Sequence, residues 1–325
     1  MTSQNKVAVI IPLYNAAEFI EKTIRSILDQ TFTDFHIYVI DDISTDGSDA
    51  IVKKLAVGNK KITYHRMPRQ GGCPAPTKNE GVRLATAEYV AFCDHDDWWK
   101  AEKLARQVEF LDNHPEIQIL GCNVEIVDTD RNKSLGNFWS DPARVNPDTI
   151  RQLVLDGPVL ASTSCMIARR PYLLEHPFDE RLLGSDEYDL SLRAILDDPR
   201  QVAILPEVLA YWRWHEGSLS HSKTAAERAL QDETLFAAKI LARSDLNEAE
   251  KSQIKARLRM VTRRAGNAAI DEMRIDEAKI RYQQAAGQGD RTSRIMLILI
   301  KNAPALASAL AGIKRGYSQT HPVFR

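Results

Sequence analysis

The stretch His36-Ile-Tyr-Val-Ile-Asp-Asp42 joins an apolar run to two acids, and Tyr89-Val-Ala-Phe-Cys-Asp-His-Asp-Asp97 repeats that design further along the chain. Each apolar run has the length and composition of a buried β-strand. The segments around them alternate between strand-like runs and helical periodicity, with short connections. This alternation is typical of βαβ units, so it predicts an α/β fold with a mainly parallel, mixed, Rossmann-like sheet and helices on both faces.

The neighbouring elements follow from the same periodicities. A first helix is expected around Ile20, Ile24, Ile27 and Leu28, with Asn15 as its N-cap. The glycines and prolines of residues 71–76 indicate a loop. The other expected strands are 7–11, 62–65 and 117–122, and the other expected helices are 48–55, 77–87 and 100–113.

Composition divides the 325 residues into two parts. Residues 1–221 carry 24 basic and 33 acidic side chains, whereas residues 222–325 carry 19 basic and 11 acidic ones. The second part contains three proline-free segments rich in Ala, Glu, Lys and Arg, which predict helices at 225–241, 246–269 and 275–286. We therefore expect an α/β domain over 1–221 and a helical C-terminal region over 222–325. The net charge of −1 argues against a nucleic-acid partner.

Asp94, Asp96 and Asp97 follow directly on an expected strand. Three carboxylates this close repel one another unless a cation compensates, and hard oxygen ligands suit Mg²⁺ or Mn²⁺. The carboxyl ends of parallel strands meet at one edge of a sheet, where ligands bind, so Asp41-Asp42 is expected at the same edge. The alternative is an acidic loop that caps the helix beginning near Lys100.

Asp42 is a candidate for hydrogen bonds to the base or ribose of a nucleotide, as strand-end acids are in other nucleotide-binding folds. The alternative is a turn that caps the next helix, for which Asp46 or Ser48 is the better candidate.

Several motifs in a fixed order resemble those of the family-2 glycosyltransferases. The resemblance covers about residues 6–221 and is specific to the family, but it does not identify the sugar. The segments that carry it are 7–15, 26–32, 39–48, 71–79, 87–98, 185–193, 211–215 and 218–220.

The resemblance implies a GT-A fold in a catalytic domain over 1–221 and a nucleotide-sugar donor, most often a UDP-sugar. It places Pro12, Tyr14 and Asp42 at the nucleoside. The segment Asp94-His-Asp-Asp97 matches the metal-binding DxD motif, with Asp96 and Asp97 nearest the diphosphate and a Mn²⁺ or Mg²⁺ ion.

The implied activity is metal-dependent, inverting sugar transfer to a saccharide or lipid-linked acceptor, in bacterial surface polysaccharide or lipopolysaccharide assembly. His215 lies in the motif that closes the catalytic domain, where it could contact the metal or the diphosphate. The alternative for His215 is a structural role.

The family's acid pair is reversed in this chain. The common order is Glu then Asp, with Asp as the base, whereas this sequence has Asp186 then Glu187. Alignment through Tyr188 and Asp189 puts Glu187 at the position of the base, and Asp186 remains the second candidate. The alternative is that Ser185 or Asp186 caps the helix that follows.

The sequence is also compatible with two other functions. A nucleotidyltransferase shares a nucleotide-binding α/β layout and acidic metal ligands, but it has no need of Glu187. A non-catalytic sugar-nucleotide-binding protein would tolerate a destroyed acidic motif, whereas both acidic motifs are intact here.

Cysteine content and features near both ends of the chain indicate where in the cell the protein is expected. Sparse cysteines and a strand-length apolar run at 7–13 predict a cytoplasmic protein without a signal peptide. Residues 291–325 hold six basic side chains, no acidic ones and two apolar runs, 295–300 and 305–313. We expect peripheral contact of 291–325 with the inner face of the membrane, or a terminal helix that packs on the catalytic domain.

Overall fold

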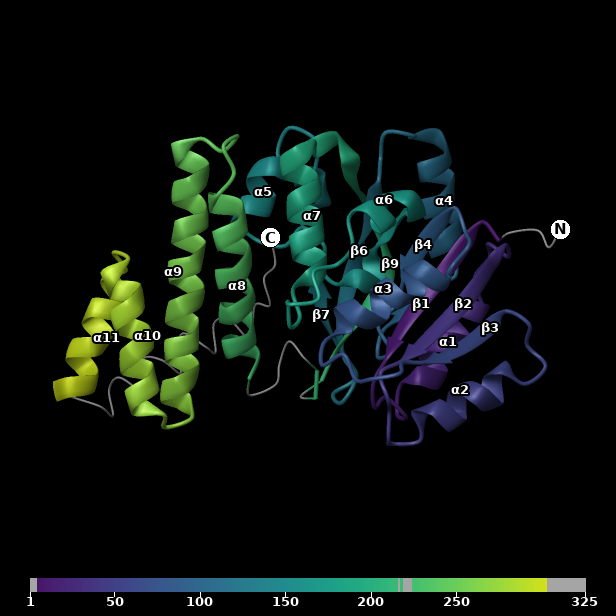
Figure 1. Cartoon of the computed structure of the whole chain (residues 1–325), viewed down its shortest axis with the longest axis horizontal. Coiled ribbons are helices and arrows are strands. Elements are labelled where there is room, and N and C mark those ends of the chain that lie inside the picture. Colours follow the sequence, from purple (N-terminus) through teal and green to yellow (C-terminus); the bar gives the residue numbers. More distant parts are fainter. Residues whose placement is uncertain (1–4, 216, 219–223, 303–325) are drawn as a thin grey trace.

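The computed structural model describes residues 5–215, 217–218 and 224–302, in which a twisted sheet lies at one end and four helices stand beside it (Figure 1). The sheet has nine strands in the order β3-β2-β1-β4-β8-β6-β9-β5, and β7 pairs with β6 beside this path. The strands are β1 (Val7–Leu13), β2 (Phe35–Asp41), β3 (Ile62–Arg66), β4 (Tyr89–Phe92), β5 (Trp98–Trp99), β6 (Ile119–Asp128), β7 (Lys133–Asn137), β8 (Ile167–Arg169) and β9 (Val202–Trp214).

The predicted parallel sheet is confirmed, and antiparallel strands make it mixed. β1 pairs in parallel with β2 and β4, β2 pairs in parallel with β3, and β6 pairs in parallel with β9. The short strand β8 runs antiparallel between β4 and β6 and joins the two parallel groups. Every residue of β1 is buried, as expected for a strand with neighbours on both sides and helices over both faces.

Helices connect and cover these strands. They are α1 (Ile20–Leu28), α2 (Ser48–Ala56), α3 (Pro74–Leu84), α4 (Lys103–Asn113), α5 (Ile150–Asp156), α6 (Arg170–Glu175) and α7 (Asp186–Asp197). The amphipathic pattern of α1 is borne out, because Ile20, Ile24 and Ile27 are all fully buried.

Two local predictions were wrong. Asn15 is not the N-cap of α1, because the helix begins at Ile20 and Asn15 adopts a positive φ of 46° in the loop before it. The expected loop at 71–76 ends early, because α3 begins at Pro74. Proline suits the first position of a helix, where its missing N–H has no partner to lose.

The remaining helices are α8 (Ala225–Leu241), α9 (Glu248–Asp271), α10 (Ile275–Gly287) and α11 (Arg291–Asn302), which stand side by side in Figure 1. Phe236 and Ile240 of α8 and Ile254 of α9 belong to the same buried cluster as the sheet. A separate cluster joins the end of α9 to α10 and α11. The division of the chain at residue 222 stays a prediction, and α8 shares the core of the α/β unit.

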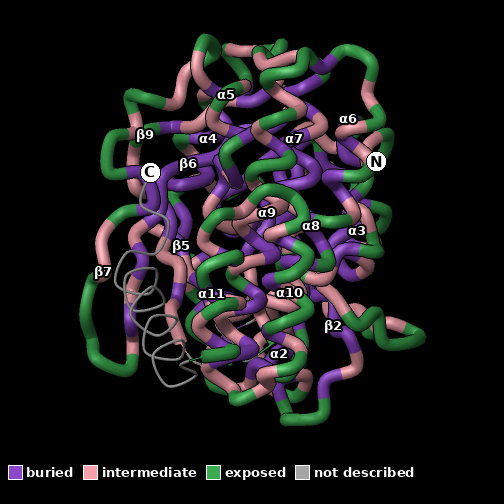
Figure 2. The backbone as a smooth tube through the Cα atoms, turned by 90° about the vertical axis from the view of Figure 1, so that its left-hand side faces the viewer, coloured by how far each residue is buried: buried purple, intermediate pink, exposed green. Residues whose placement is uncertain are grey.

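α11 packs on its neighbouring helices and not on the sheet. Its buried residues are Ser293, Met296 and Ile300, and the last two join Tyr282 of α10 in the separate cluster. Viewed from this end, buried and exposed segments alternate along the tubes of α10 and α11 (Figure 2). Among the described residues, no helix has the length and apolar character needed to cross a membrane. The rest of the basic tail, 303–325, lies outside the described residues.

Candidate active site

The loops that follow β1 and β2 are tied to each other. The Asn15 side chain accepts a hydrogen bond from Thr45 N (2.8 Å), and Asn15 N donates to Ser44 Oγ (3.0 Å). Asp46 accepts a hydrogen bond from Ala17 N (2.8 Å). These contacts hold two loops that are distant in sequence at one edge of the sheet, the edge at which α/β proteins bind ligands.

The two acids at the end of β2 have different surroundings. Asp41 Oδ2 accepts hydrogen bonds from the Tyr64 hydroxyl (2.6 Å) and Arg66 (3.0 Å), so Asp41 is a structural residue. Asp42 Oδ1 accepts a hydrogen bond from Gly71 N (2.6 Å). Burial raises the pKa of Asp42 above its usual value, against the backbone hydrogen bonds from Gly71 and Gly72.

Pro12 and Tyr14 lie at the end of β1, beside this pair of loops. Pro12 is buried, and its carbonyl oxygen accepts a hydrogen bond from His95 Nδ1 (3.0 Å). Tyr14 is 45% exposed, which is unusual for an aromatic residue next to a buried strand. The nucleoside role of Pro12, Tyr14 and Asp42 stays a prediction, and all three lie at the same strand-end edge.

Asp94 and Asp97 accept hydrogen bonds from a segment for which the sequence predicted no role. Thr163 Oγ1 donates to Asp94 Oδ1 (2.9 Å), and Ser164 Oγ donates to Asp97 Oδ2 (2.6 Å). The other oxygen of Asp97 accepts a hydrogen bond from Arg213 N (2.8 Å). Asp97 is only 1% exposed, and burial together with the charges of its neighbours raises its pKa well above the usual value.

Asp96 faces His215, with Nε2 of the imidazole 3.0 Å from Asp96 Oδ2. The two side chains are 17% and 15% exposed, so both can be reached from solvent. Burial would raise the pKa of Asp96, but the hydrogen bond from His215 and the nearby histidine charges lower it. Among Asp94, Asp96 and Asp97, Asp96 is the acid whose pKa is lowered, which favours its charged form.

The residues of this loop and His215 could hold the expected metal ion only if a bound ligand, such as a phosphate of the substrate, completed its coordination. Among the described residues, no three His, Cys, Asp or Glu side chains are grouped so that they could hold a metal ion. Mg²⁺ and similar cations are commonly bound through one or two carboxylates, with substrate phosphates completing the coordination. Asp96 and His215 could supply the protein side of such a site. Asp97 stays a predicted ligand, although both of its carboxylate oxygens already accept hydrogen bonds from the protein.

Lys78 of α3 lies among the acids of two motifs. Its ammonium group is 2.9 Å and 3.2 Å from the two carboxylate oxygens of Asp186, and both side chains are almost completely buried. Burial would lower the pKa of Lys78, but the charges of Asp186, Asp94 and Glu187 raise it overall. The buried ammonium group of Lys78 therefore compensates negative charge of both the acidic loop after β4 and the acid pair of α7.

Glu187 lies half-buried in the first turn of α7. Burial and the charge of Asp186 raise its pKa to about 8, although Lys78 acts in the opposite direction. A carboxyl group with this pKa gains and loses a proton near neutral pH, which is the property of an efficient general base.

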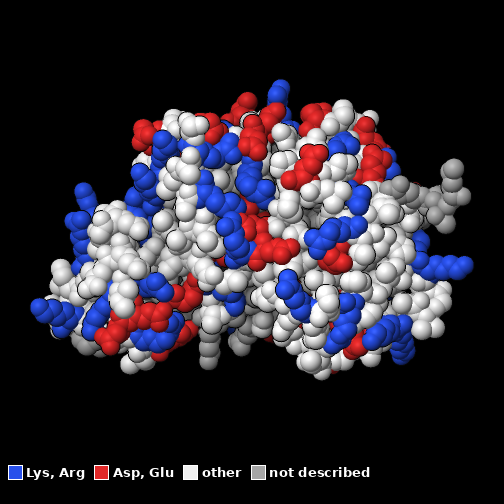
Figure 3. Space-filling model, viewed as in Figure 1, with Lys and Arg blue, Asp and Glu red and all other residues white. Residues whose placement is uncertain are grey.

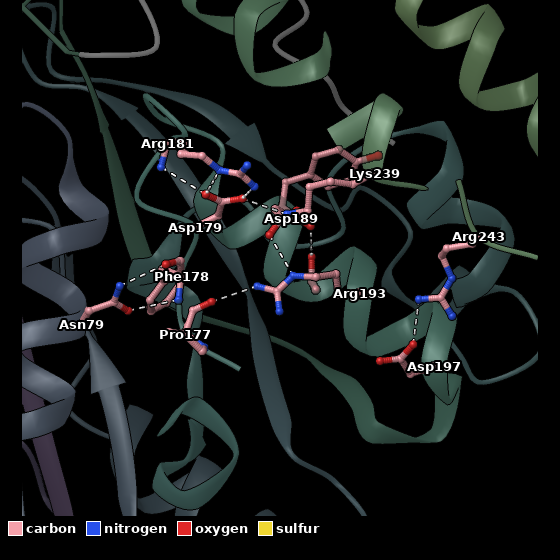
Figure 4. Close-up of polar contacts among 12 residues, drawn as sticks. Asn79, Pro177, Phe178, Asp179, Arg181, Asp189, Arg193, Asp197, Lys239 and Arg243 are labelled. Carbon is pink, nitrogen blue, oxygen red and sulfur yellow. Dashed lines mark hydrogen bonds and ion pairs between the residues drawn. The ribbon is translucent and has the colours of Figure 1, made fainter. Parts of the chain in front are cut away.

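The helix-cap alternative for the acid pair was wrong. Ser185 occupies the N-cap position of α7 without a capping hydrogen bond from its side chain, and its hydroxyl instead interacts with Asp232 of α8. The carboxylate of Asp186 forms an ion pair with Lys78. α7 is fixed further along by Asp189, which binds Arg193 and Lys239 (both 2.8 Å; Figure 4).

α3 is fixed to the loop that precedes α7. Asn79 donates to Phe178 O (3.0 Å) and accepts from Phe178 N (3.0 Å), as Figure 4 shows. Lys239 of α8 binds Asp179 (2.9 Å) in addition to Asp189. These contacts set the position of the acid pair relative to Lys78, and Lys239 makes α8 part of that support.

Much of the sequence matches the model of a known protein family. The family model for glycosyl transferase family 2 matches residues 8–176, which is more than half of the chain. An uncharacterized glycosyltransferase of Nostoc sp. is 30% identical over 70% of this chain and 70% of its own length. The putative teichuronic acid biosynthesis glycosyltransferase TuaG of Bacillus subtilis is 38% identical over 32% of this chain, and the match spans 41% of TuaG.

Solved structures share the fold. Staphylococcus aureus TarS in complex with UDP-GlcNAc matches with a TM-score of 0.66 at 20% identity, over 97% of this chain and 92% of that chain. The mannosyltransferase of Pyrobaculum calidifontis in complex with GDP-Man and Mn²⁺ matches with a TM-score of 0.59 at 18% identity, over 96% and 85%. At these identities the likeness concerns the fold alone.

The chain belongs to glycosyl transferase family 2 and has a GT-A fold with added C-terminal helices. It is therefore a glycosyltransferase, and the two other functions left open by the sequence are set aside.

Replacing Lys78 tests the role of the buried ion pair. Lys78→Met leaves Asp186 buried without its cation, and removal of one partner of a buried pair costs about 3–5 kcal/mol of unfolding free energy. Replacing both partners in Lys78→Met/Asp186→Leu is expected to recover most of that loss. Urea unfolding of the three proteins measures these differences.

Arg83→Met is the matched control for Lys78→Met. Arg83 is a cation on the same helix that pairs with Glu80 (2.7 Å), but its side chain is 57% exposed. An exposed pair of this kind is worth less than about 1 kcal/mol. Equal losses for Lys78→Met and Arg83→Met would contradict the role assigned to Lys78.

Proposed function

We propose that the protein transfers a sugar, with inversion, from a UDP-sugar to a hydroxyl of a saccharide or lipid-linked acceptor in bacterial surface polysaccharide assembly. The observation that supports this proposal most strongly is the position of Glu187, a carboxyl group with a pKa of about 8 beside the buried ion pair of Lys78 and Asp186. Family membership supports sugar transfer. TuaG and TarS, a poly(ribitol-phosphate) β-N-acetylglucosaminyltransferase, support a cell-surface polymer as the product.

Pro12, Tyr14 and Asp42 bind the nucleoside of the donor in this proposal. Tyr14 offers an exposed ring for stacking on the base, and Asp42 offers a carboxylate that is already oriented by Gly71 N. Pro12 fixes the end of β1 and, through its carbonyl, the imidazole of His95. The strand-end edge thus provides an aromatic face and an oriented acceptor for the uridine.

The acids of the DxD loop lie toward the diphosphate. Asp96 and His215 would hold a Mn²⁺ or Mg²⁺ ion, with Asp94 beside them and Asp97 bracing the loop through Ser164 and Arg213 N. A bound divalent cation supplies Lewis-acid stabilisation of the departing diphosphate. Support comes from the charged state of Asp96 and from the Mn²⁺ in the related mannosyltransferase.

Glu187 is the proposed base. The acceptor hydroxyl gives its proton to Glu187 as its oxygen forms a bond to the anomeric carbon, and the bond from that carbon to the diphosphate oxygen breaks on the opposite face. The nucleoside diphosphate leaves with the bonding electron pair. One displacement inverts the anomeric centre. Asp186 is a positioning residue in this proposal, because its carboxylate binds Lys78 and its charge raises the pKa of Glu187.

We also propose that α11 contacts an anionic membrane surface. Its exposed residues are Arg291, Arg294, Ile295, Ile298, Lys301 and Asn302. Their spacing places them along one stripe of the helix, in which two isoleucines, 57% and 62% exposed, lie between basic groups. Basic and apolar side chains on one helix face favour the interface of an anionic bilayer.

Glu187→Gln tests the assignment of the base. The variant keeps the shape of the side chain but cannot take a proton, so the transfer rate should fall by ~10²-fold or more. In the unchanged enzyme, kcat/KM should rise with pH up to about 8 and then level, because the base must be deprotonated in the free enzyme. A variant with full activity, or with the same pH profile, would remove Glu187 from the chemistry.

Asp96→Asn and His215→Ala test the metal site. Both variants should lose the enhancement of UDP affinity that Mn²⁺ produces, because each removes a ligand that faces the diphosphate. Titration calorimetry with and without Mn²⁺ measures this, and the exposed Asp148 supplies the control variant Asp148→Asn. A Mn²⁺ effect that survives in both variants would exclude Asp96 and His215 as ligands.

Ile295→Ser/Ile298→Ser tests the membrane contact. The double variant should bind vesicles rich in phosphatidylglycerol several-fold more weakly in a sedimentation assay. Ile280→Ser is the control, because Ile280 is 51% exposed but lies on α10. Equal binding by the unchanged protein and the double variant would refute the contact through α11.

A further inference from the structure

Asp232 of α8 binds the loop that leads directly into the acid pair. Its two carboxylate oxygens accept hydrogen bonds from Leu183 N (2.8 Å) and Gly184 N (3.1 Å). Ser185 also donates to this carboxylate, from its hydroxyl and from its backbone N–H. Asp232 is only 1% exposed, so these groups take the place of water around it. One side chain of α8 therefore holds three consecutive residues that end where α7 begins.

The charge of this carboxylate matters for its hold on the loop. Burial raises the pKa of Asp232, whereas the hydrogen bonds from the loop lower it. Hydrogen bonds to a charged acceptor are stronger than those to a neutral one. A negative charge beside the start of a helix is also favoured by the partial positive charge of the helix N-terminus. A neutral side chain at this position would therefore bind the loop less firmly.

The loop between α6 and α7 is anchored near both of its ends by other helices. Near its start, Asn79 of α3 binds the backbone of Phe178 through two hydrogen bonds. At its end, α8 binds residues 183–185 as described above. Between these points, Lys239 of α8 binds Asp179 (2.9 Å). The loop therefore fixes α7 relative to α3, the helix whose buried ammonium group binds the acid pair.

α8 also follows α7 beyond this loop. The ring of Phe236 packs edge-on against Tyr188, with 5.0 Å between the ring centroids, and Lys239 binds Asp189 (2.8 Å). On the face drawn in Figure 3, acidic and basic side chains lie side by side where α8 meets the α/β unit. The match to the family model ends at residue 176, before both helices. α8 thus supports the acid pair, although the sequence assigned it to a separate helical region.

We propose that Asp232 is a positioning residue for Glu187. It fixes the residues before α7, and this keeps the carboxyl group of Glu187 away from bulk water and beside Asp186. The inference rests on the proposed function, because the position of Glu187 matters for sugar transfer only if Glu187 is the base. A reacting group that is misplaced by ~1 Å can lower a rate by ~10²-fold. Asp232 acts through Glu187 and not on the substrate.

Asp232→Asn in the full-length protein is the direct test. The amide keeps one acceptor oxygen, but its NH₂ group faces a second backbone donor, so the loop should loosen. Glu187 then becomes more exposed and loses a nearby negative charge, and both changes lower its pKa. In a ¹³C NMR titration, the midpoint of the Glu187 carboxyl group should fall from about 8 to about 7 or below.

Glu233→Gln is the matched control. Glu233 is the next residue of α8, is 2% exposed and pairs with Arg257 (2.7 Å), so its replacement also removes one buried negative charge from the helix. It should destabilise the protein without moving the midpoint of Glu187. An equal shift in both variants, or no shift in Asp232→Asn, would overturn the proposal. If Asp232→Asn does not fold, Ser185→Ala removes one donor to the carboxylate, and an unmoved midpoint in that variant would overturn the proposal instead.

Hydrolysis of UDP-sugars, with water in place of the acceptor, separates this inference from the proposed function. Asp232→Asn should lower kcat by ~10²-fold and leave the KM for the donor nearly unchanged, because the proposed nucleoside residues lie at the ends of β1 and β2. An unchanged kcat would contradict the positioning role. Hydrolysis by the unchanged protein, together with a Glu187 midpoint that does not respond to Asp232→Asn, refutes the inference and leaves the proposed function standing. A midpoint that falls in Asp232→Asn, without hydrolysis of any nucleotide sugar by the unchanged protein, refutes the proposed function and leaves only the hold of Asp232 on Glu187.

Discussion

The buried ammonium group of Lys78 is the interaction on which the rest of the site depends. Asp186 binds it directly, and the charges of Asp94 and Glu187 also act on it. Without a cation, these acids would repel one another in a region of low dielectric constant. Lys78 is carried by α3, so the helix that packs on β1 and β2 also sets the electrostatics of α7.

The two acidic motifs contain carboxyl groups whose pKa values are shifted in opposite directions. Asp96 has a lowered pKa because it faces His215, whereas burial raises the pKa of Glu187 to about 8. The first carboxyl is suited to binding a cation and the second to moving a proton. Glu187 also affects stability. Its pKa in the folded protein lies above the usual value of about 4.5, so its contribution to stability is complete below about pH 4.5 and is lost as pH rises to about 8.

The sequence predicted the fold well, because strand and helix periods differ and both recur with short connections. It also placed the acidic clusters at strand ends, which the structure confirms for Asp42 and Asp94. It could not give side-chain pairings between distant segments. Thr163 and Ser164 support the acidic loop after β4 from the segment before β8, and their only signal is a short polar run before an apolar strand. The ion pair of Lys78 and Asp186 joins residues 108 positions apart, which no periodicity reveals.

Burial and the charge of Asp186 raise the pKa of Glu187 to about 8, against the opposing charge of Lys78. A ¹³C NMR titration of the Glu187 carboxyl carbon in the protein without donor measures that pKa directly. We expect a midpoint of about 8 in the unchanged protein and a higher midpoint in Lys78→Met, because loss of the cation favours the protonated acid. A midpoint near 4.5 in the unchanged protein, or one that does not move in Lys78→Met, would contradict this expectation.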